Sequence, residues 1–274
     1  MGILGESTKR KTEEPGSTAI LVMSCDAYAD VWDGFSKCIE EYWPDCPYPI
    51  YISSETIPAP KGMIFERTLF STAEDWGGRL KESLEQMKED RVFFVLDDMW
   101  LCRPVCTDSI IKAGALLRNS DVGVVRLTVD SVKKTVYSGN PDYMEITFGE
   151  PYRVSTAPSI WDKRFLLSVL KTPESAWEFE RVGSFRESGK SQRVLGVRDA
   201  LYTFIGDAGA VSRGAYDQSA VAFAKAHGIM IDLEKRKVKA KKDYVISGIK
   251  SLIYSLCPKG VVKIQNRLYH LRNK

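Results

Sequence analysis

The chain has 274 residues, of which 44% are hydrophobic and 27% are charged, and its formal net charge is +3. This is the composition of an ordinary globular protein, so we expect disorder only near the ends. The length fits one large domain with an ample core, and no run of about 18 apolar residues could form a membrane-spanning helix.

Cysteine usage indicates a reducing compartment. Residues 1–17 are mostly polar and lack the apolar core of a signal peptide. The six cysteines form no Cys-x-x-Cys pair, so we expect free thiols in a cytoplasmic protein. Only two histidines accompany them and no ligand spacing fits, which disfavours a zinc site.

The net charge is divided unevenly along the chain. Residues 232–274 contain twelve Lys or Arg and three acids, a net charge of +9, so residues 1–231 carry −6. The main part of the chain is therefore acidic and the tail is basic, and we expect them to meet different partners.

The first half of the chain alternates buried-strand patterns with helical periodicity, which predicts parallel strand–helix–strand units. Ser71 and Glu74 fit a capping box for a helix that carries apolar positions 76, 80, 84 and 87. After a loose leader at 1–17, the other predicted elements are strands at 18–24, 49–53, 65–70 and 122–127, and helices at 29–42 and 108–118.

The second half is less regular, with hairpins and loops expected at 128–154. One helix is predicted to begin with Thr172 as N-cap, Pro173 at its first position and Glu174 in its first turn. The other predicted elements are helices at 162–170 and 215–226 and strands at 200–205 and 210–212.

The chain is organised around residues 91–101, an apolar run of β-formers that is interrupted by Asp97 and Asp98. The run reads as a strand buried on both faces of a mainly parallel sheet. Because ligands of α/β sheets bind beyond the carboxyl ends of the strands, the two carboxylates would emerge at a binding edge. They are suited to a divalent cation and a phosphate-bearing ligand, although they could also simply end the strand.

Four segments between residues 18 and 228 resemble the glycosyltransferases of the GT-A type, similar to bacterial enzymes that build capsular or lipopolysaccharide glycans. The segments are the strand that ends at Asp26, a Gly-Gly-Arg at 77–79, an Asp-x-Asp-like Leu-Asp-Asp at 96–98, and a Trp-x-x-Glu-like segment at 177–180. The resemblance implies an α/β, Rossmann-like single domain over 18–231, with a nucleotide-sugar-binding half at 18–127 and an acceptor half at 128–231.

The resemblance also implies the donor site. Asp26, Arg79 and Asp97 would bind a nucleotide-sugar donor, with a UDP-sugar expected, and Asp98 would bind Mn²⁺ or Mg²⁺. The family usually separates its two aspartates by one residue, whereas here they are adjacent. Because adjacent strand side chains point to opposite faces, we expect Asp98 to contact the metal and Asp97 to hold the ribose or a backbone amide.

On the acceptor side, the resemblance implies Glu180 as the catalytic base, with Glu178 as the fallback, and Trp161 and Trp177 as acceptor-binding residues. The acceptor would be a glycan or a polyprenyl-linked glycan of bacterial surface polysaccharide synthesis. A hexosyl or acetamidohexosyl group would be transferred with inversion, because the base then lies opposite the leaving diphosphate.

Each of these residues also has an ordinary structural interpretation. The two glutamates of 177–180 could be surface acids, Arg79 could pair with Glu82 or Glu85, and Trp161 could be a core residue. A nucleotidyltransferase shares the sheet and the carboxylates, but that class usually has a glycine-rich loop after its first strand, and residues 24–28 contain no glycine. A non-enzymatic nucleic-acid or membrane-binding module that uses the basic tail is the other alternative.

The tail, 232–274, is predicted to be a basic amphipathic helix over 243–256, with five apolar residues at helical spacing between two cationic flanks. Such a helix suits an anionic membrane surface, where each basic residue contributes about 1 kcal/mol. We therefore expect a cytoplasmic protein held peripherally at the inner face of the membrane, while nucleic acid is disfavoured because no recognised motif is present. A helix that docks on the domain is the alternative.

Overall fold

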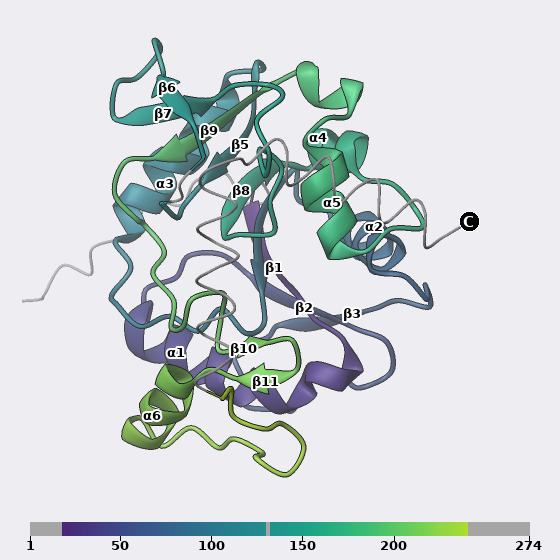
Figure 1. Ribbon diagram of the computed structural model, residues 1–274, viewed down its shortest axis with the longest axis vertical. Helices are drawn as coiled ribbons and strands as arrows, with labels where there is room; N and C mark the ends of the chain where they lie inside the picture. The colour runs from purple at the N-terminus through teal and green to yellow at the C-terminus, as the bar shows by residue number, and fades with distance from the viewer. Residues whose placement is uncertain (1–17, 130–131, 241–274) are drawn as a thin grey trace, which may run out of the picture.

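A computed structural model describes residues 18–129 and 132–240 of the chain. These residues form three layers, in which a nine-stranded mixed sheet lies between two groups of helices (Figure 1). The predicted α/β class with a largely parallel central sheet is confirmed.

The sheet has a parallel half and a mixed half. The first half of the chain forms a parallel set in which β1 (Thr18–Met23) pairs with both β2 (Ile50–Ser54) and β4 (Arg91–Leu96), and the antiparallel β8 (Ser159–Asp162) then separates β4 from β5 (Val122–Arg126). From one edge to the other the strands are β3 (Arg67–Phe70), β2, β1, β4, β8, β5, β9 (Arg193–Val197), β7 (Tyr143–Ile146) and β6 (Lys134–Val136).

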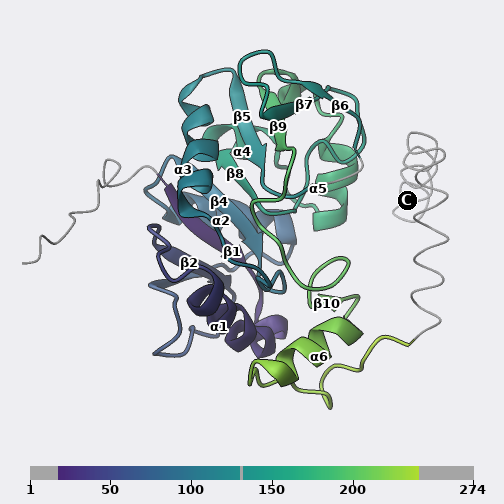
Figure 2. The same cartoon turned by 90° about the vertical axis from the view of Figure 1, so that its left-hand side faces the viewer.

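Helices cover both faces of this sheet (Figure 2). On one face lie α1 (Trp32–Tyr42), which follows the 3₁₀ helix η1 (Asp26–Val31), and α3 (Thr107–Ala115), which continues into η2 (Leu116–Arg118). On the other face lie α2 (Trp76–Gln86), α4 (Lys163–Val169) and α5 (Ala176–Gly183), followed by η3 (Glu187–Lys190). A small hairpin of β10 (Val211–Ser212) and β11 (Ala215–Tyr216) leads into α6 (Gln218–Ala226), which packs beside α1.

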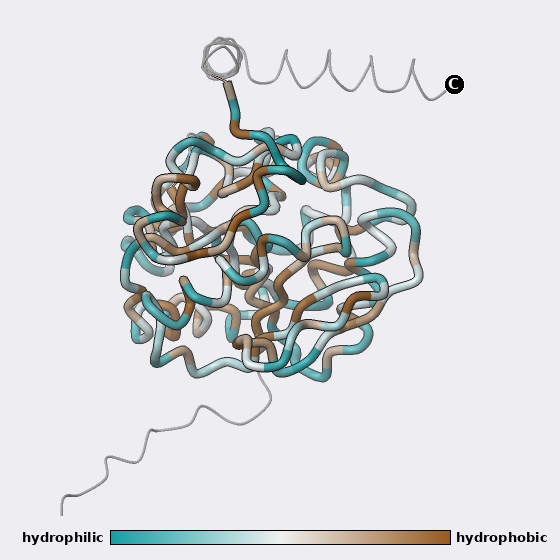
Figure 3. Tube along the Cα trace, turned by 90° about the horizontal axis from the view of Figure 1, so that it is seen from below, coloured by the Kyte–Doolittle hydropathy of each residue, from teal (hydrophilic) through white to brown (hydrophobic). Residues whose placement is uncertain are grey.

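The central strands are apolar on both faces because each face has its own core. Ile20 and Phe93 belong to the core under α1 and α3, whereas Leu21 and Phe94 belong to the core under α2, α4 and α5. The alternation of side chains along a strand divides one apolar run between the two cores. Figure 3 colours the chain by hydropathy, and hydrophobic stretches alternate with hydrophilic ones along it.

Two predicted helix starts were wrong. Asp75, not Ser71, is the N-cap of α2, where its side chain accepts from Gly78 N at 2.9 Å, and Ser71 instead donates to Glu82 at 2.7 Å. The helix predicted after Thr172 begins at Ala176. Glu174 therefore lies before this helix, where it is 4% exposed and pairs with Arg186.

Three differences concern strands of the second half. The short strands β8 and β9 were not predicted, and their partners lie far away in the chain. The strand predicted at 200–205 is a loop that makes a single bridge between Leu101 and Phe204.

The described start of the tail, residues 232–240, packs against the residues that precede it. Residues 232–240 form a turn and an extended stretch. The extended stretch is bonded to Tyr216 of β11, because Tyr216 N donates to Lys237 O and Lys239 N donates to Tyr216 O, both at 2.9 Å. Arg236 is 5% exposed and is ion-paired with Asp30. The helix predicted at 243–256 and the leader at 1–17 lie outside the described residues. Within the described ranges, no helix has the length and apolar character needed to cross a membrane.

Candidate active site

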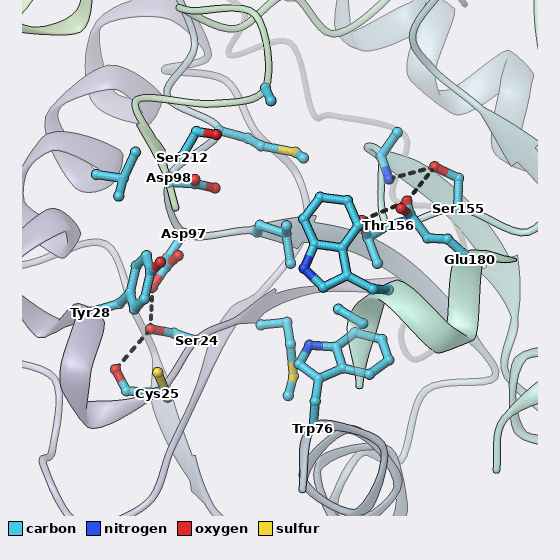
Figure 4. A pocket seen from close by; sticks show the side chains of 18 of the residues that line it. Ser24, Cys25, Tyr28, Trp76, Asp97, Asp98, Ser155, Thr156, Glu180 and Ser212 are labelled. Atoms are coloured by element: carbon cyan, nitrogen blue, oxygen red, sulfur yellow. Dashed lines mark hydrogen bonds between the residues drawn. The ribbon is translucent and has the colours of Figure 1, made fainter. Parts of the chain in front are cut away.

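A cavity of about 500 Å³ opens at the carboxyl ends of β1 and β4 (Figure 4). This is the edge of an α/β sheet where ligands bind. The lining includes five of the eight predicted site residues, which are Arg79, Asp97, Asp98, Trp177 and Glu180. They come from α2, the end of β4 and α5, so the fold brings three separate segments together at one cavity.

Asp97 is held by side chains at the end of β1. Ser24 donates its hydroxyl proton to the Asp97 carboxylate, and Trp32 Nε1 donates to Ser24 Oγ at 2.7 Å. Asp97 is 4% exposed, and this burial raises the pKa of its carboxyl group although the Ser24 hydrogen bond opposes the rise. The side chain is therefore a fixed and buried acid in the cavity wall.

Asp98, the next residue, is almost as buried but less well satisfied. Among the described residues, nothing forms a hydrogen bond with its Oδ1 atom, which is buried. Burial, and then the charge of Asp97, raises the pKa of the Asp98 carboxyl group. Gly209 lies directly against this group, because a Cβ atom at Gly209 would be 2.7 Å from Asp98 Oδ2.

This arrangement fits a divalent cation. A buried carboxylate oxygen without a partner, beside a second carboxylate, is stabilised by a positive charge. Within 18–129 and 132–240, no three His, Cys, Asp or Glu side chains are grouped as a closed metal cage. Mg²⁺ commonly takes only one or two carboxylates and completes its shell with water and substrate phosphates, and Asp98 with Asp97 could supply that set.

Glu180 lies across the cavity from the two aspartates (Figure 4). Its Oε1 atom accepts three hydrogen bonds, from Ser155 Oγ at 3.0 Å, Thr156 N at 2.8 Å and Thr156 Oγ1 at 2.9 Å. None of these bonds involves Oε2. The carboxylate is thus oriented by one oxygen while the other can accept a proton from a substrate.

Glu178, the fallback base, has a different role. It forms a capping box with Ser175, in which the Glu178 carboxylate accepts from Ser175 N at 2.8 Å and from Ser175 Oγ at 2.7 Å. Glu178 is not among the cavity-lining residues. In the structure Glu178 is therefore part of the N-terminal cap of α5.

Arg79 reaches the cavity from the first turn of α2. Its Nη1 atom donates to Glu74 O at 3.0 Å and lies 3.5 Å from Glu55 Oε1, while its buried Nε has no partner among the described residues. The alternative partners Glu82 and Glu85 are engaged elsewhere. Arg79 is therefore a cation held at the cavity with donor capacity left over.

The two glycines before Arg79 are explained by packing. A Cβ atom at Gly77 would lie 2.4 Å from Lys171 O, and one at Gly78 would lie 2.7 Å from Ala73 Cβ. Gly77 N donates to Glu174 O at 2.8 Å, which ties α2 to the segment before α5. Close approach of these backbones places Arg79 and the start of α5 at the same cavity.

Two indoles give the cavity an apolar wall. Trp177 is 59% exposed, an unusual exposure for so large an apolar side chain. Trp76 also lines the cavity and packs against Phe179 with ring centroids 5.3 Å apart. An exposed indole beside Glu180 provides a flat surface for a sugar ring or a base.

Asp26 and Trp161 are not brought to the cavity lining. Asp26 accepts hydrogen bonds from the segment 54–57, including Ser54 Oγ at 2.6 Å and Ile57 N at 3.1 Å. Burial would raise the pKa of Asp26, but these bonds outweigh it and hold the pKa well below its ordinary range. Trp161 is 1% exposed in the core, where it stacks on Phe165, as in its structural interpretation.

Several lining residues were not predicted. Tyr28 of η1 lines the cavity, and the Arg236 guanidinium lies 4.1 Å from the centre of its ring. Thr156 and Ser155 precede the unpredicted strand β8 and fix Glu180. A cluster of small polar residues before a strand was the only sequence signal for this pair.

The β10–β11 hairpin contributes Ser212 and Arg213 to the lining, and neither was predicted as a site residue. The backbone φ of Arg213 is +55°, and that of Gly214 is +76°, the pattern of a type I′ turn. Within the described residues, Arg213 and Tyr152 are the two non-glycine residues with positive φ. A side chain in this left-handed region costs about 1–2 kcal/mol, because Cβ approaches the following carbonyl oxygen.

No protein-family model and no curated protein sequence matches this chain. Among solved structures, the chain is similar to residues 1–349 of S. aureus TarS in complex with UDP, with a TM-score of 0.46 and 11% identity over 68% of this chain and 59% of that one. It therefore spans about three fifths of that TarS structure.

Two further solved structures resemble the chain to a comparable degree. One is CMP:2-keto-3-deoxy-manno-octonic acid synthetase complexed with CTP, with a TM-score of 0.43 and 12% identity over 78% of this chain and 98% of that one. The other is the 2-C-methyl-D-erythritol 4-phosphate cytidylyltransferase from Thermus thermophilus, with a TM-score of 0.43 and 12% identity over 77% of this chain and 99% of that one. Similarity at this level does not identify an activity, so the function must be inferred from the cavity itself.

Proposed function

We propose that this protein is a glycosyltransferase that moves a sugar from a nucleoside-diphosphate sugar to a hydroxyl acceptor. The observation that carries the proposal is the opposed placement of two kinds of acid across one cavity. A buried aspartate pair lies at the end of β4, and Glu180 faces it with one oxygen fixed and the other uncommitted.

The residues divide the chemistry as follows. Arg79 lines the same cavity as Asp97 and Asp98 and offers a cation to the diphosphate of the donor. Mn²⁺ or Mg²⁺, when bound at Asp98, supplies charge stabilisation for the diphosphate. Trp177 provides the surface on which the acceptor rests.

The transfer itself needs a base. Glu180 Oε2 takes the proton of the acceptor hydroxyl while the hydroxyl oxygen of the acceptor forms a bond to the anomeric carbon of the donor sugar. The bond from that carbon to the diphosphate breaks, and the nucleoside diphosphate leaves with the electron pair. Because Glu180 lies opposite the aspartates, attack from its side inverts the configuration.

The acceptor and its location form part of the same proposal. A glycan on a polyprenyl lipid would be presented at the cytoplasmic face of a membrane, in the synthesis of a bacterial surface polysaccharide. The charge of +9 over residues 232–274 supports attachment to an anionic surface. Lys235 and Arg236 contribute less than expected, because both pair with Asp30.

A donor panel tests the reaction class. Purified protein is incubated with UDP-, GDP-, dTDP- and CMP-linked sugars, with and without Mn²⁺, and release of the nucleotide is measured. We expect release from one or a few donors, increased by a hydroxyl acceptor. Release of pyrophosphate from a nucleoside triphosphate and a sugar 1-phosphate, with no turnover of nucleotide sugars, would instead establish a nucleotidyltransferase.

A further inference from the structure

Arg213 is a cation at the cavity whose side chain has no hydrogen-bond or ion-pair partner among the described residues. It is exposed and lines the cavity. Arg79 is the other Lys or Arg among the described lining residues, and it is partly paired with Glu55. The cavity thus contains one cation tied to the domain and one that is available to a ligand.

The hairpin that carries Arg213 is held firmly against the aspartate pair. Ala210 N, just before β10, donates to Asp98 O at 2.6 Å. Val211 pairs with Tyr216 across the hairpin, and Tyr216 is bound in turn by the backbone of residues 237 and 239. These contacts fix the base of the turn, so the backbone of Arg213 is held near the end of β4 that carries Asp98.

The turn also has the wrong residue for its geometry. A type I′ turn needs positive φ at both central positions, which Asn or Gly adopts more easily than Arg. A strained residue beside a cavity is typical of functional sites, where the side chain is kept for what it binds. Strain alone would be relieved by Asn, so the arginine side chain needs another explanation.

We infer that Arg213 binds the distal phosphate of the donor diphosphate, which leaves with the nucleotide. Its planar guanidinium can donate two parallel hydrogen bonds to phosphate oxygens, on a group whose charge grows as the sugar departs. Arg79 and Arg213 then contact the diphosphate from α2 and from the hairpin. This inference rests on the proposed function, because it requires an anionic nucleotide in the cavity.

Calorimetric titration separates this role from a structural one. The full-length protein is titrated in MnCl₂ with dTDP, CDP, GDP and UDP, and the tightest ligand is then compared with its monophosphate and its nucleoside. Arg213→Asn should weaken diphosphate binding about 10-fold or more, the range for a hydrogen bond to a charged group. Nucleoside binding should change less than about 2-fold, and the thermal unfolding midpoint should stay the same or rise, because Asn tolerates positive φ.

Two further variants keep the test decisive. Arg213→Lys retains the charge and the strained backbone, and it should lose less diphosphate affinity than Arg213→Asn. Arg164→Asn removes a cation whose side chain is 92% exposed on α4, away from the cavity lining, and should leave binding unchanged.

The outcomes are distinguishable. If the wild-type protein binds none of the four diphosphates, the proposed function fails and the inference fails with it. If the wild-type protein binds a diphosphate and both Arg213→Asn and Arg213→Lys bind it as tightly as the wild type does, the inference is overturned while the proposed function stands. A loss that is the same for diphosphate, monophosphate and nucleoside would also overturn it, because Arg213 would then shape the cavity rather than bind phosphate.

Discussion

Replacing Glu180 with Gln tests the assignment of the base while leaving the site intact. Three donors, two on Thr156 and one on Ser155, converge on Oε1. The amide oxygen of Gln can take that place, since the backbone N–H of Thr156 cannot donate to an amide nitrogen. The NH₂ group then replaces Oε2 at the cavity, where it cannot accept a proton.

The expected loss follows from the loss of general-base catalysis. Turnover should fall by roughly 10²–10⁴, which corresponds to about 3–5 kcal/mol of transition-state free energy. The Kd for the nucleoside diphosphate should change little, because Glu180 lies on the other side of the cavity from the aspartates. Steady-state release of the nucleoside diphosphate and calorimetric binding measure the two quantities.

Glu178→Gln is the matched control, because it lies on the same helix but belongs to the capping box with Ser175. It should keep turnover within about 3-fold and change the free energy of unfolding by less than about 0.5 kcal/mol, because Gln can also complete a capping box. The assignment is refuted if Glu180→Gln turns over normally, or if Glu178→Gln shows the larger loss of turnover.

Three further predictions concern the aspartate pair and the tail. Burial raises the pKa of the Asp98 carboxyl group in the folded state, so the stability that its proton contributes is full below the unfolded-state pKa of about 3.9 and is lost as pH rises toward the folded-state pKa. In urea denaturation of the metal-free protein, Asp98→Asn should flatten this decline and unfold at a higher urea concentration than wild type at pH 8, and the variant should lose Mn²⁺-dependent transfer. A lower urea midpoint than wild type at pH 8 would contradict the reasoning. Gly209→Ala should cost about 1–3 kcal/mol of stability in backbone strain and should also weaken Mn²⁺ binding, because its Cβ would crowd the Asp98 carboxylate. The control Gly62→Ala, at φ +93° with open space around it, should lose stability only. Equal Mn²⁺ affinities of the two variants would argue against the crowding. Deleting residues 241–274, which keeps Arg236 and its ion pair with Asp30, should abolish cosedimentation with anionic vesicles and leave donor turnover unchanged. The membrane proposal is refuted if the full-length protein does not cosediment with anionic vesicles at low salt.

The core of the fold could be predicted because its signals are local. Strands β1 and β4 are buried on both faces, so they appear in the sequence as unbroken apolar runs, and Asp97 and Asp98 are conspicuous where the second run is interrupted. The antiparallel β8 has only four residues and pairs with β4 and β5 at long range, which leaves little local pattern to detect.

The choice between the two glutamates depended on the exact start of a helix. Residues two positions apart lie about 200° apart around a helix axis, so only one of Glu178 and Glu180 can face the cavity. Ser175, followed three residues later by Glu178, is itself a capping-box signature that assigns Glu178 to the cap. No comparable signal marks Arg213, because its position depends on a hairpin held by distant backbone contacts.

The central claim is that the cavity at the end of β4 binds the diphosphate of a nucleotide together with a divalent cation. Crystals grown with Mn²⁺ and the nucleoside diphosphate released in the donor panel would test it through the anomalous scattering of manganese. We expect one manganese peak within coordination distance of an Asp98 carboxylate oxygen and of the diphosphate, with Glu180 across the cavity. A nucleotide bound outside this cavity, or a manganese ion bound to the protein without Asp98, would contradict it.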